Sequence, residues 1–197
     1  MFIEAVDHLR CPEDHPEQHL VLLPESMEER SVRTGDLGCP VCGREFRIVD
    51  GMLDTGGAPE QVAPTALDGD AAAALIGLEG PGGYLALVGG IAARHAELMA
   101  AMPGIRVIAV NPPGSVRDEG ELSVLRGRTL PIRSNSMRGV LLGPGFGGDP
   151  AWVAEAMRVT LSGLRVVGEG SSPDIAELEV LAAAGGCWVG SKLRNRL

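Results

Sequence analysis

Four side chains near the N-terminus have the types and the spacing of a zinc site. Cys39 and Cys42 form a C-x2-C pair, and Gly43 behind them allows the tight turn that brings two thiolates onto one metal ion. Upstream, Cys11 and His15 form a C-x3-H pair. Three sulfurs and one nitrogen complete the tetrahedral coordination that zinc prefers. A site closed by four protein ligands is structural rather than catalytic.

The fourth ligand of this site has alternatives. Asp14 stands where a second C-x2-C pair would place its cysteine, and Asp14, His8 or His19 could bind the metal instead of His15. Without a metal, the cysteines would be small buried hydrophobic residues. A segment of about 50 residues with few large apolar side chains is only marginally stable alone, and a metal would supply the missing stability.

The segment that contains these cysteines resembles the small zinc-ribbon proteins that activate RNA and protein methyltransferases. The similarity covers about residues 5–54 and rests on the stretches 9–12 and 37–53. Members of that family usually carry a cysteine near position 14, where this chain has Asp14. The resemblance implies a zinc-ribbon fold, and such ribbons also occur fused ahead of methyltransferase domains.

Charge and composition divide the chain near residue 56. Residues 1–60 carry 13 acids and 5 bases, whereas residues 61–197 carry 13 acids and 12 bases. The stretch 55–64 is rich in glycine and proline and lacks periodicity, which is typical of a linker. We therefore predict three parts: a zinc-ribbon β domain at 1–55, a linker at 56–67 and a second domain at 68–197.

The second domain alternates short apolar runs with helical segments. Asp149-Pro150 and Ser172-Pro173 are N-cap and proline pairs that begin helices. Buried strands separated by helices predict an α/β fold, in which a doubly wound and mostly parallel sheet is covered on both faces. The expected strands are 19–23, 46–49, 84–88, 106–110, 122–125, 139–142, 164–167 and 187–190, and the expected helices are 68–78, 91–102, 149–160 and 172–184.

This order of elements resembles class I S-adenosylmethionine-dependent methyltransferases, which have a Rossmann-like fold, over about residues 68–193. The resemblance rests on four matching stretches, which are 84–90 with its helix, 106–111, 130–137 and 155–167. Ligands of doubly wound sheets bind at the carboxyl ends of the strands, at the topological switch point. The resemblance implies that a bound cofactor would contact Gly89 and Gly90 after the first strand and Asn111 after the second.

The residues at these cofactor positions differ from the family pattern. The family places an acid and a G-x-G-x-G turn around the end of the first strand, where this chain has Ala86 and retains only Gly89 and Gly90. At the end of the second strand the family has an acid that receives the ribose hydroxyls. Asn111 stands there instead and brings a single acceptor oxygen without charge.

These changes predict a domain that kept its fold and lost its cofactor. Each lost charge-assisted hydrogen bond costs roughly 1.5–3 kcal/mol, so two or three losses would take a micromolar cofactor towards millimolar affinity. No Ser-His-Asp or Cys-His arrangement stands at a motif position. The predicted protein is a pseudoenzyme with a structural zinc site, serving as a protein-binding subunit of a larger assembly.

Two alternatives to this function stay open at this level. One is an active S-adenosylmethionine-dependent methyltransferase with an unusual pocket, because methyl transfer needs mainly the positioning of donor and acceptor. The other is an activator partner of a separate methyltransferase. Guanidinium groups suit interface pairing, so a stretch without acids could form a docking patch; its basic residues are Arg126, Arg128, Arg133 and Arg138.

Composition narrows the setting in which the protein works. A formal net charge of −9 argues against a general nucleic-acid binder, which needs a basic surface. No apolar run is long enough to span a membrane, and residues 1–8 lack the features of a signal peptide. A cytoplasmic location is therefore expected.

Overall fold

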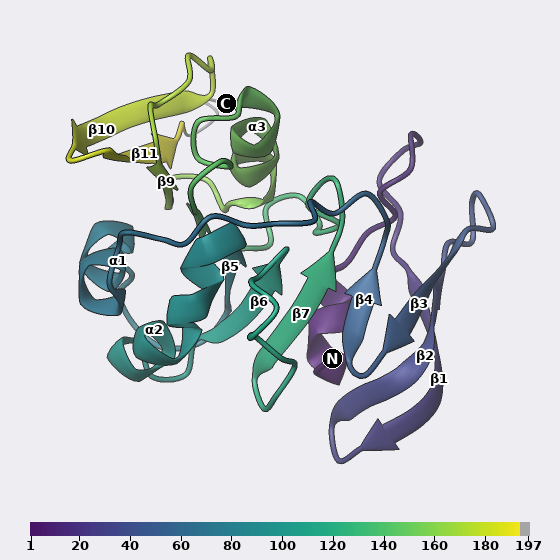
Figure 1. The fold of residues 1–197 in the computed structure, drawn as a ribbon. Coiled ribbons are helices and arrows are strands. Elements are labelled where there is room, and N and C mark those ends of the chain that lie inside the picture. The colour runs from purple at the N-terminus through teal and green to yellow at the C-terminus, as the bar shows by residue number, and fades with distance from the viewer. Residues whose placement is uncertain (194–197) are drawn as a thin grey trace.

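The computed structural model describes residues 1–193, which form one large mixed sheet flanked by helices (Figure 1). The strand order is β1-β2-β3-β4-β7-β6-β5-β8-β9-β11-β10. In chain order the elements are η1 (Ile3–His8), β1 (Val21–Glu28), β2 (Ser31–Gly38), β3 (Glu45–Val49), β4 (Met52–Asp54), α1 (Gly69–Ile76), β5 (Tyr84–Val88), η2 (Gly89–Arg94), α2 (His95–Ala101), β6 (Arg106–Val110), β7 (Leu122–Arg126), β8 (Gly139–Leu142), α3 (Pro150–Val159), β9 (Arg165–Glu169), β10 (Leu178–Ala184) and β11 (Cys187–Lys192).

The middle of the sheet is parallel and doubly wound. From β5 the chain moves outward to β6 and β7, returns to the other side of β5 as β8, and continues to β9. The topological switch point therefore lies between β5 and β8. The sheet as a whole is mixed rather than mostly parallel, because β1 to β4 and β9 to β10 pair antiparallel.

Alternation along the buried strands builds a core on each face of the sheet. In β5, Tyr84, Ala86 and Val88 pack on the face covered by η1 and α3, whereas Leu85 and Leu87 pack on the face covered by α1 and α2. Successive side chains of a strand point to opposite faces, so a strand that is apolar throughout needs cover on both sides. This cover fixes β5 and its carboxyl end firmly within the sheet.

The first 54 residues extend the same sheet. Strand β4 pairs in parallel with β7, with Leu53 opposite Leu125. The core on one face also combines residues of both parts of the chain, such as Leu37 and Ile48 with Ile108. The expected boundary near residue 56 thus falls in a segment that joins two halves of one sheet, and the division into separate domains stays a prediction.

The helix expected at 172–184 is wrong. Residues Leu178–Ala184 form strand β10, which pairs antiparallel with β11 from Leu178 opposite Lys192 to Ala184 opposite Cys187. The sequence has good helix formers, but Gly185 and Gly186 both have positive φ, as a tight hairpin turn requires. Pairing with β11 overrides the local preference. The other three expected helices are present, with 91–102 divided into η2 and α2.

Capping explains where two of these helices begin. The Asp68 side chain accepts a hydrogen bond from the amide of Ala71 at 2.7 Å, and the Asp149 side chain accepts one from Ala151 at 2.8 Å. Each carboxylate satisfies an amide that the first turn leaves without a partner. Neither these helices nor the others in the described part of the chain have the length and apolar character needed to cross a membrane.

Candidate functional site

The structure brings Cys11, His15, Cys39 and Cys42 together in one cluster. Their ligand atoms all lie within 4.8 Å of one another. Cys39 follows β2 directly, and a hydrogen bond from the amide of Gly43 to the Cys39 carbonyl (2.9 Å) closes the turn that carries Cys42. Gly43 has a φ of +70°, so it supplies the left-handed conformation expected from the sequence.

The distances within the cluster fit a tetrahedral ion. The Sγ atoms of Cys11 and Cys42 are 3.8 Å apart, and the Cys39 Sγ lies 3.4 Å from His15 Nε2. Zinc bonds of about 2.3 Å to sulfur and 2.0–2.1 Å to nitrogen at tetrahedral angles give separations of about 3.8 and 3.5 Å. The donor set and these two separations therefore suit zinc.

Crowding of three thiols shapes their acidity. Burial raises the pKa of the Cys11 thiol to about 12, and the neighbouring thiols of Cys39 and Cys42 act in the same direction. Burial also opposes ionisation of Cys39, but hydrogen bonds from the amides of Cys42 and Val41 outweigh it and lower the pKa of that thiol to about 7. The Cys39 thiol is therefore more acidic than that of Cys11, and a divalent cation would favour ionisation of its cysteine ligands.

The alternative ligands lie elsewhere. The His8 ring packs 4.4 Å from the Tyr84 ring, and burial lowers the pKa of this histidine. Asp14 and His19 are both exposed. Within residues 1–193 the group of possible metal ligands comprises only Cys11, His15, Cys39 and Cys42.

At the second candidate site, the carboxyl edge of the sheet, the chain itself covers the crevice. Residues 58–66, which we call the strap, run from β4 towards α1 across the carboxyl ends of the parallel strands (Figure 1). A Cβ atom added to Gly90 would collide with the Ala63 carbonyl oxygen and lie 2.9 Å from the amide of Thr65. A Cβ added to Gly89 would lie 2.5 Å from the Phe146 ring and 3.3 Å from the Val62 side chain. Because Gly89 and Gly90 have no Cβ atom, there is space above them. The strap occupies this space, which a ligand would otherwise need.

Hydrogen bonds anchor the strap at both ends. Before it, the amide and hydroxyl of Thr55 both donate to the Arg126 carbonyl, at 2.8 and 3.0 Å. At its end, the carboxylate of Glu169, which is 5% exposed, accepts from the Thr65 hydroxyl (2.5 Å) and the Ala66 amide (2.9 Å). Residues 58–64 make no hydrogen bond within the described part of the chain. The strap is therefore fixed by its two ends and by packing.

Removing the Thr65 hydroxyl is expected to loosen the strap. In Thr65→Val the Glu169 carboxylate keeps one of its two donors, at a cost of about 1–2 kcal/mol, which raises the open population roughly 5–30-fold. Limited proteolysis with a protease of broad specificity should then cut within 58–64 faster by a similar factor. Thr34→Val, which removes an exposed hydroxyl pair with Ser26, is the control. Equal cleavage rates for both variants and the parent chain would contradict the anchoring role of Thr65.

The side chain of Asn111 forms hydrogen bonds within the protein itself. Its side-chain amide donates to the Gly127 carbonyl at 2.8 Å, and its side-chain oxygen accepts from the Gly127 amide at 3.0 Å. The residue is 2% exposed and has a φ of +50°, a conformation that asparagine tolerates better than most residues. Asn111 thus joins the ends of β6 and β7, and both of its side-chain polar atoms already have partners.

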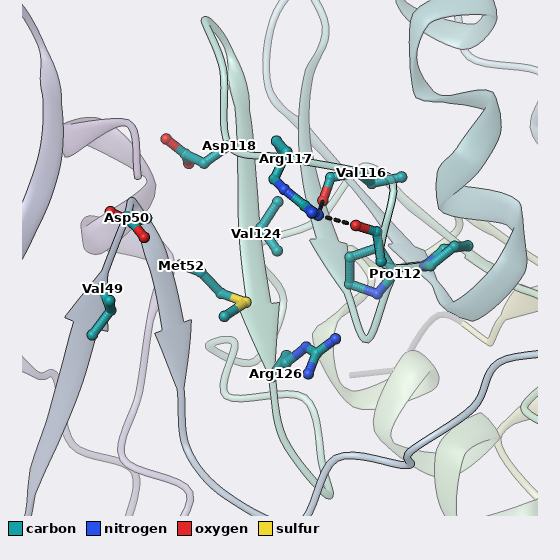
Figure 2. Close-up of a pocket in the computed structure, with 11 residues that line it drawn as sticks. Val49, Asp50, Met52, Pro112, Val116, Arg117, Asp118, Val124 and Arg126 are labelled. Atoms are coloured by element: carbon teal, nitrogen blue, oxygen red, sulfur yellow. Dashed lines mark hydrogen bonds between the residues drawn. The ribbon is translucent and has the colours of Figure 1, made fainter.

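Two small cavities lie next to the loop that follows β6. One of about 290 Å³ lies between the strap and the loop after β6 and is lined by Val62, Asn111 and Arg126. A neighbouring one of about 330 Å³ lies between the β3–β4 turn and the same loop. Figure 2 shows Arg126 apart from Asp50 and Asp118 in this second pocket, while Arg117 turns towards the carbonyl of Val116. The charged groups of that pocket therefore do not converge on one point.

The four arginines expected to form a docking patch do not share one surface. Arg138 donates to backbone carbonyls just before β5, including that of Gly82 at 2.7 Å, so it lies at the amino end of the strands. Arg133 donates to the Asp7 carbonyl at 3.2 Å. Arg126 and Arg128 lie at the opposite, carboxyl end, where they line cavities beside the strap. Only these last two remain candidates for a common contact.

Comparison with known proteins gives fold-level similarity only. No protein-family model and no curated protein matches the chain. Among solved structures, the chain is similar to one from the complex between the Haloferax volcanii Trm112 methyltransferase activator and a proposed methyltransferase (21% identity, TM-score 0.40, 49% of this chain and 48% of that chain). It is also similar to a proposed methyltransferase of Bacillus halodurans C-125 (16% identity, TM-score 0.41, 53% and 52%) and to the antibiotic-resistance methyltransferase Kmr (12% identity, TM-score 0.45, 68% and 98%).

The chain spans about half the length of the first two of these structures. With TM-scores of 0.45 or less, none of the three assigns an activity or a ligand to this chain.

Proposed function

We propose that this protein is a non-catalytic, methyltransferase-like subunit that binds other proteins and has a structural zinc ion. One observation carries the proposal, namely that the strap lies on Gly89 and Gly90, where a doubly wound fold would hold its ligand. S-adenosylmethionine would have to displace a segment that is tethered at both ends. Such a segment competes as an intramolecular ligand at a high effective concentration.

The side chains around the crevice support the same proposal. Ala86 is fully buried and provides no carboxylate, and Asn111 has already given both of its polar atoms to Gly127. A cofactor would have to displace the strap, and it would form few charge-assisted hydrogen bonds to offset the cost of that displacement. Affinity in the millimolar range or weaker is therefore expected.

The metal belongs to the scaffold in this proposal. Zinc held by Cys11, His15, Cys39 and Cys42 would tie the segment after η1 to the β2–β3 turn. With four protein ligands, the ion would have no open position for a substrate. Its contribution would be to the stability of the N-terminal strands.

Pairing of β4 with β7 argues against the activator alternative. If the N-terminal segment activated a separate methyltransferase by extending that enzyme's sheet through β4, this edge would have to be free. Here β4 is paired along its whole length with β7 of the same chain. The N-terminal segment therefore extends the sheet of its own chain, and its β4 edge is not free to extend the sheet of another protein.

Calorimetric titration tests the cofactor part of the proposal. S-adenosylmethionine and S-adenosylhomocysteine should show no saturable binding to the full chain below about 1 mM. A second titration uses a variant in which residues 58–64 are replaced by a Gly/Ser segment of equal length. This variant should also bind the cofactor with millimolar affinity or weaker, because Ala86 and Asn111 provide no carboxylate for it.

Each titration has an outcome that contradicts the proposal. Micromolar binding to the parent chain would favour an active methyltransferase. Micromolar binding only to the Gly/Ser variant would mean that the crevice is intact and that the strap regulates access to it.

A further inference from the structure

A cavity of about 440 Å³ lies beside the strap and is lined in part by an aromatic pair. Phe146 and Trp152 meet edge to face, with ring centroids 4.9 Å apart and planes at 90°. Phe146 is buried against Gly89, whereas Trp152 is half-buried. Apolar side chains form most of the remaining wall, and the lining residues that matter are Pro59, Val62, Pro144, Phe146 and Trp152.

Arg128 stands at the mouth of this cavity. Its side-chain stem lies along Gly57, where an added Cβ would be 3.1 Å from the Arg128 Cβ, and its backbone amide donates to the Gly56 carbonyl at 3.1 Å. The residue is exposed, and its guanidinium has no ion pair or hydrogen bond with residues 1–193. A positioned arginine without an acidic partner can bind a carboxylate through two parallel hydrogen bonds.

The cavity continues past Arg128 towards the N-terminal strands. A second space of about 400 Å³ shares Gly57 and Arg128 with the first and reaches Arg44 and Phe46. Arg44 already faces Glu13 at 3.6 Å, and other acids, among them Asp54, line this second space. The two spaces adjoin at Gly57 and Arg128, and we call them together the groove. The first space is mostly apolar, and acids line the second.

We propose that this groove binds a peptide segment of a partner protein. The segment carries an apolar anchor residue for the Phe146–Trp152 cavity, an acidic residue next to it for Arg128, and no acids beyond that point. Buried aromatic anchors and desolvated charge pairs supply most of the binding energy at protein interfaces. Two adjacent spaces lined by both parts of the chain fit an extended segment better than a compact small molecule. This inference rests on the protein-binding half of the proposed function and not on the loss of the cofactor.

Selection from a library of random displayed heptapeptides tests the inference with the full chain. Enriched peptides should combine an aromatic or aliphatic residue with a neighbouring Asp or Glu. Binding of a selected peptide should change the fluorescence of Trp152. The other tryptophan in the chain, Trp188, is 1% exposed and donates to the Gly147 carbonyl, so it gives a constant background.

Substitutions in the groove give the quantitative readout. Arg128→Glu should weaken a selected peptide about 10–100-fold, as expected for loss of a charge-assisted pair, and Arg128→Lys should retain part of the affinity. Trp152→Ala should abolish the fluorescence response and weaken binding. Arg117→Glu, at an exposed arginine of the loop after β6 that lines neither space of the groove, is the control and should leave binding unchanged.

Three results would overturn the proposal: no enrichment of peptides, selected peptides whose affinity is the same for Arg128→Glu and the parent chain, or binding of small aliphatic carboxylates such as isovalerate in place of any peptide. The last result would assign the cavity to a small molecule. Titration with S-adenosylmethionine is a separate measurement, so failure of the cofactor proposal and failure of the groove proposal are distinguishable.

Discussion

Replacing Cys39 by serine is expected to abolish the proposed zinc binding and to unfold the N-terminal strands. Cys39 is 3% exposed and lies at the centre of the cluster, within reach of His15 and Cys42. Structural zinc binds with apparent free energies of about 10–16 kcal/mol, most of which is folding free energy. Loss of half of that amount would lower the melting temperature by more than about 10 °C. Zinc content per chain and thermal unfolding followed by circular dichroism measure the two effects.

The matched control for this substitution is Cys187→Ser. Cys187 is the remaining cysteine, lies half-buried in β11 and is not part of the cluster. This variant should keep its zinc, and treatment with a strong chelator should destabilise it as much as the parent chain. A Cys39→Ser protein that retains stoichiometric zinc, or a parent chain indifferent to chelation, would contradict the zinc assignment.

Asn111→Asp is the second substitution with a large expected effect. It restores the acid that the methyltransferase pattern has at the end of the second strand, yet we expect it to destabilise the protein by about 2–4 kcal/mol. The new carboxylate would lose the donor to the Gly127 carbonyl and place a buried charge beside that oxygen. Urea unfolding measures the loss, and calorimetry should still find no micromolar binding of S-adenosylmethionine.

Asn135→Asp separates this effect from the substitution itself. Asn135 also has a positive φ (+51°), but it is exposed and its side-chain oxygen accepts from the Lys192 ammonium at 2.7 Å. A carboxylate there strengthens the contact with lysine, so stability should stay within about 0.5 kcal/mol of the parent chain or rise. Equal effects at positions 111 and 135 would mean that the Asn111–Gly127 hydrogen bonds are unimportant.

The sequence predicted best what is determined locally. The runs 84–88 and 106–110 match β5 and β6 residue for residue, because a fully buried parallel strand is apolar throughout and ends at glycine or proline. The C-x2-C and C-x3-H spacings likewise indicated four side chains that the fold brings together.

What the sequence did not predict depends on distant contacts. Leu178–Ala184 becomes a strand only because β11 lies beside it, and β2 and β4 carry too few apolar residues to be recognised from their pattern. The Gly185-Gly186 turn was the available signal for the hairpin. The strap could not be placed from composition, since a linker rich in glycine and proline has no pattern that indicates which surface it crosses. The sequence pattern indicated Gly90 as a position where a ligand could approach the backbone. In the structure the backbone of Ala63 occupies that position.

The parallel pairing of β4 with β7 would link zinc binding to the self-association of the whole molecule. Strand β7 is covered on its outer edge by only the three residues of β4, Met52, Leu53 and Asp54. If zinc loss detaches the N-terminal strands, the backbone amides and carbonyls along Leu122–Arg126 lose these partners while the rest of the sheet stays folded. A bare central edge of this kind templates pairing with other chains. When zinc is scarce, the first observable change would then be self-association of the protein, and the rest of the fold would be lost only later.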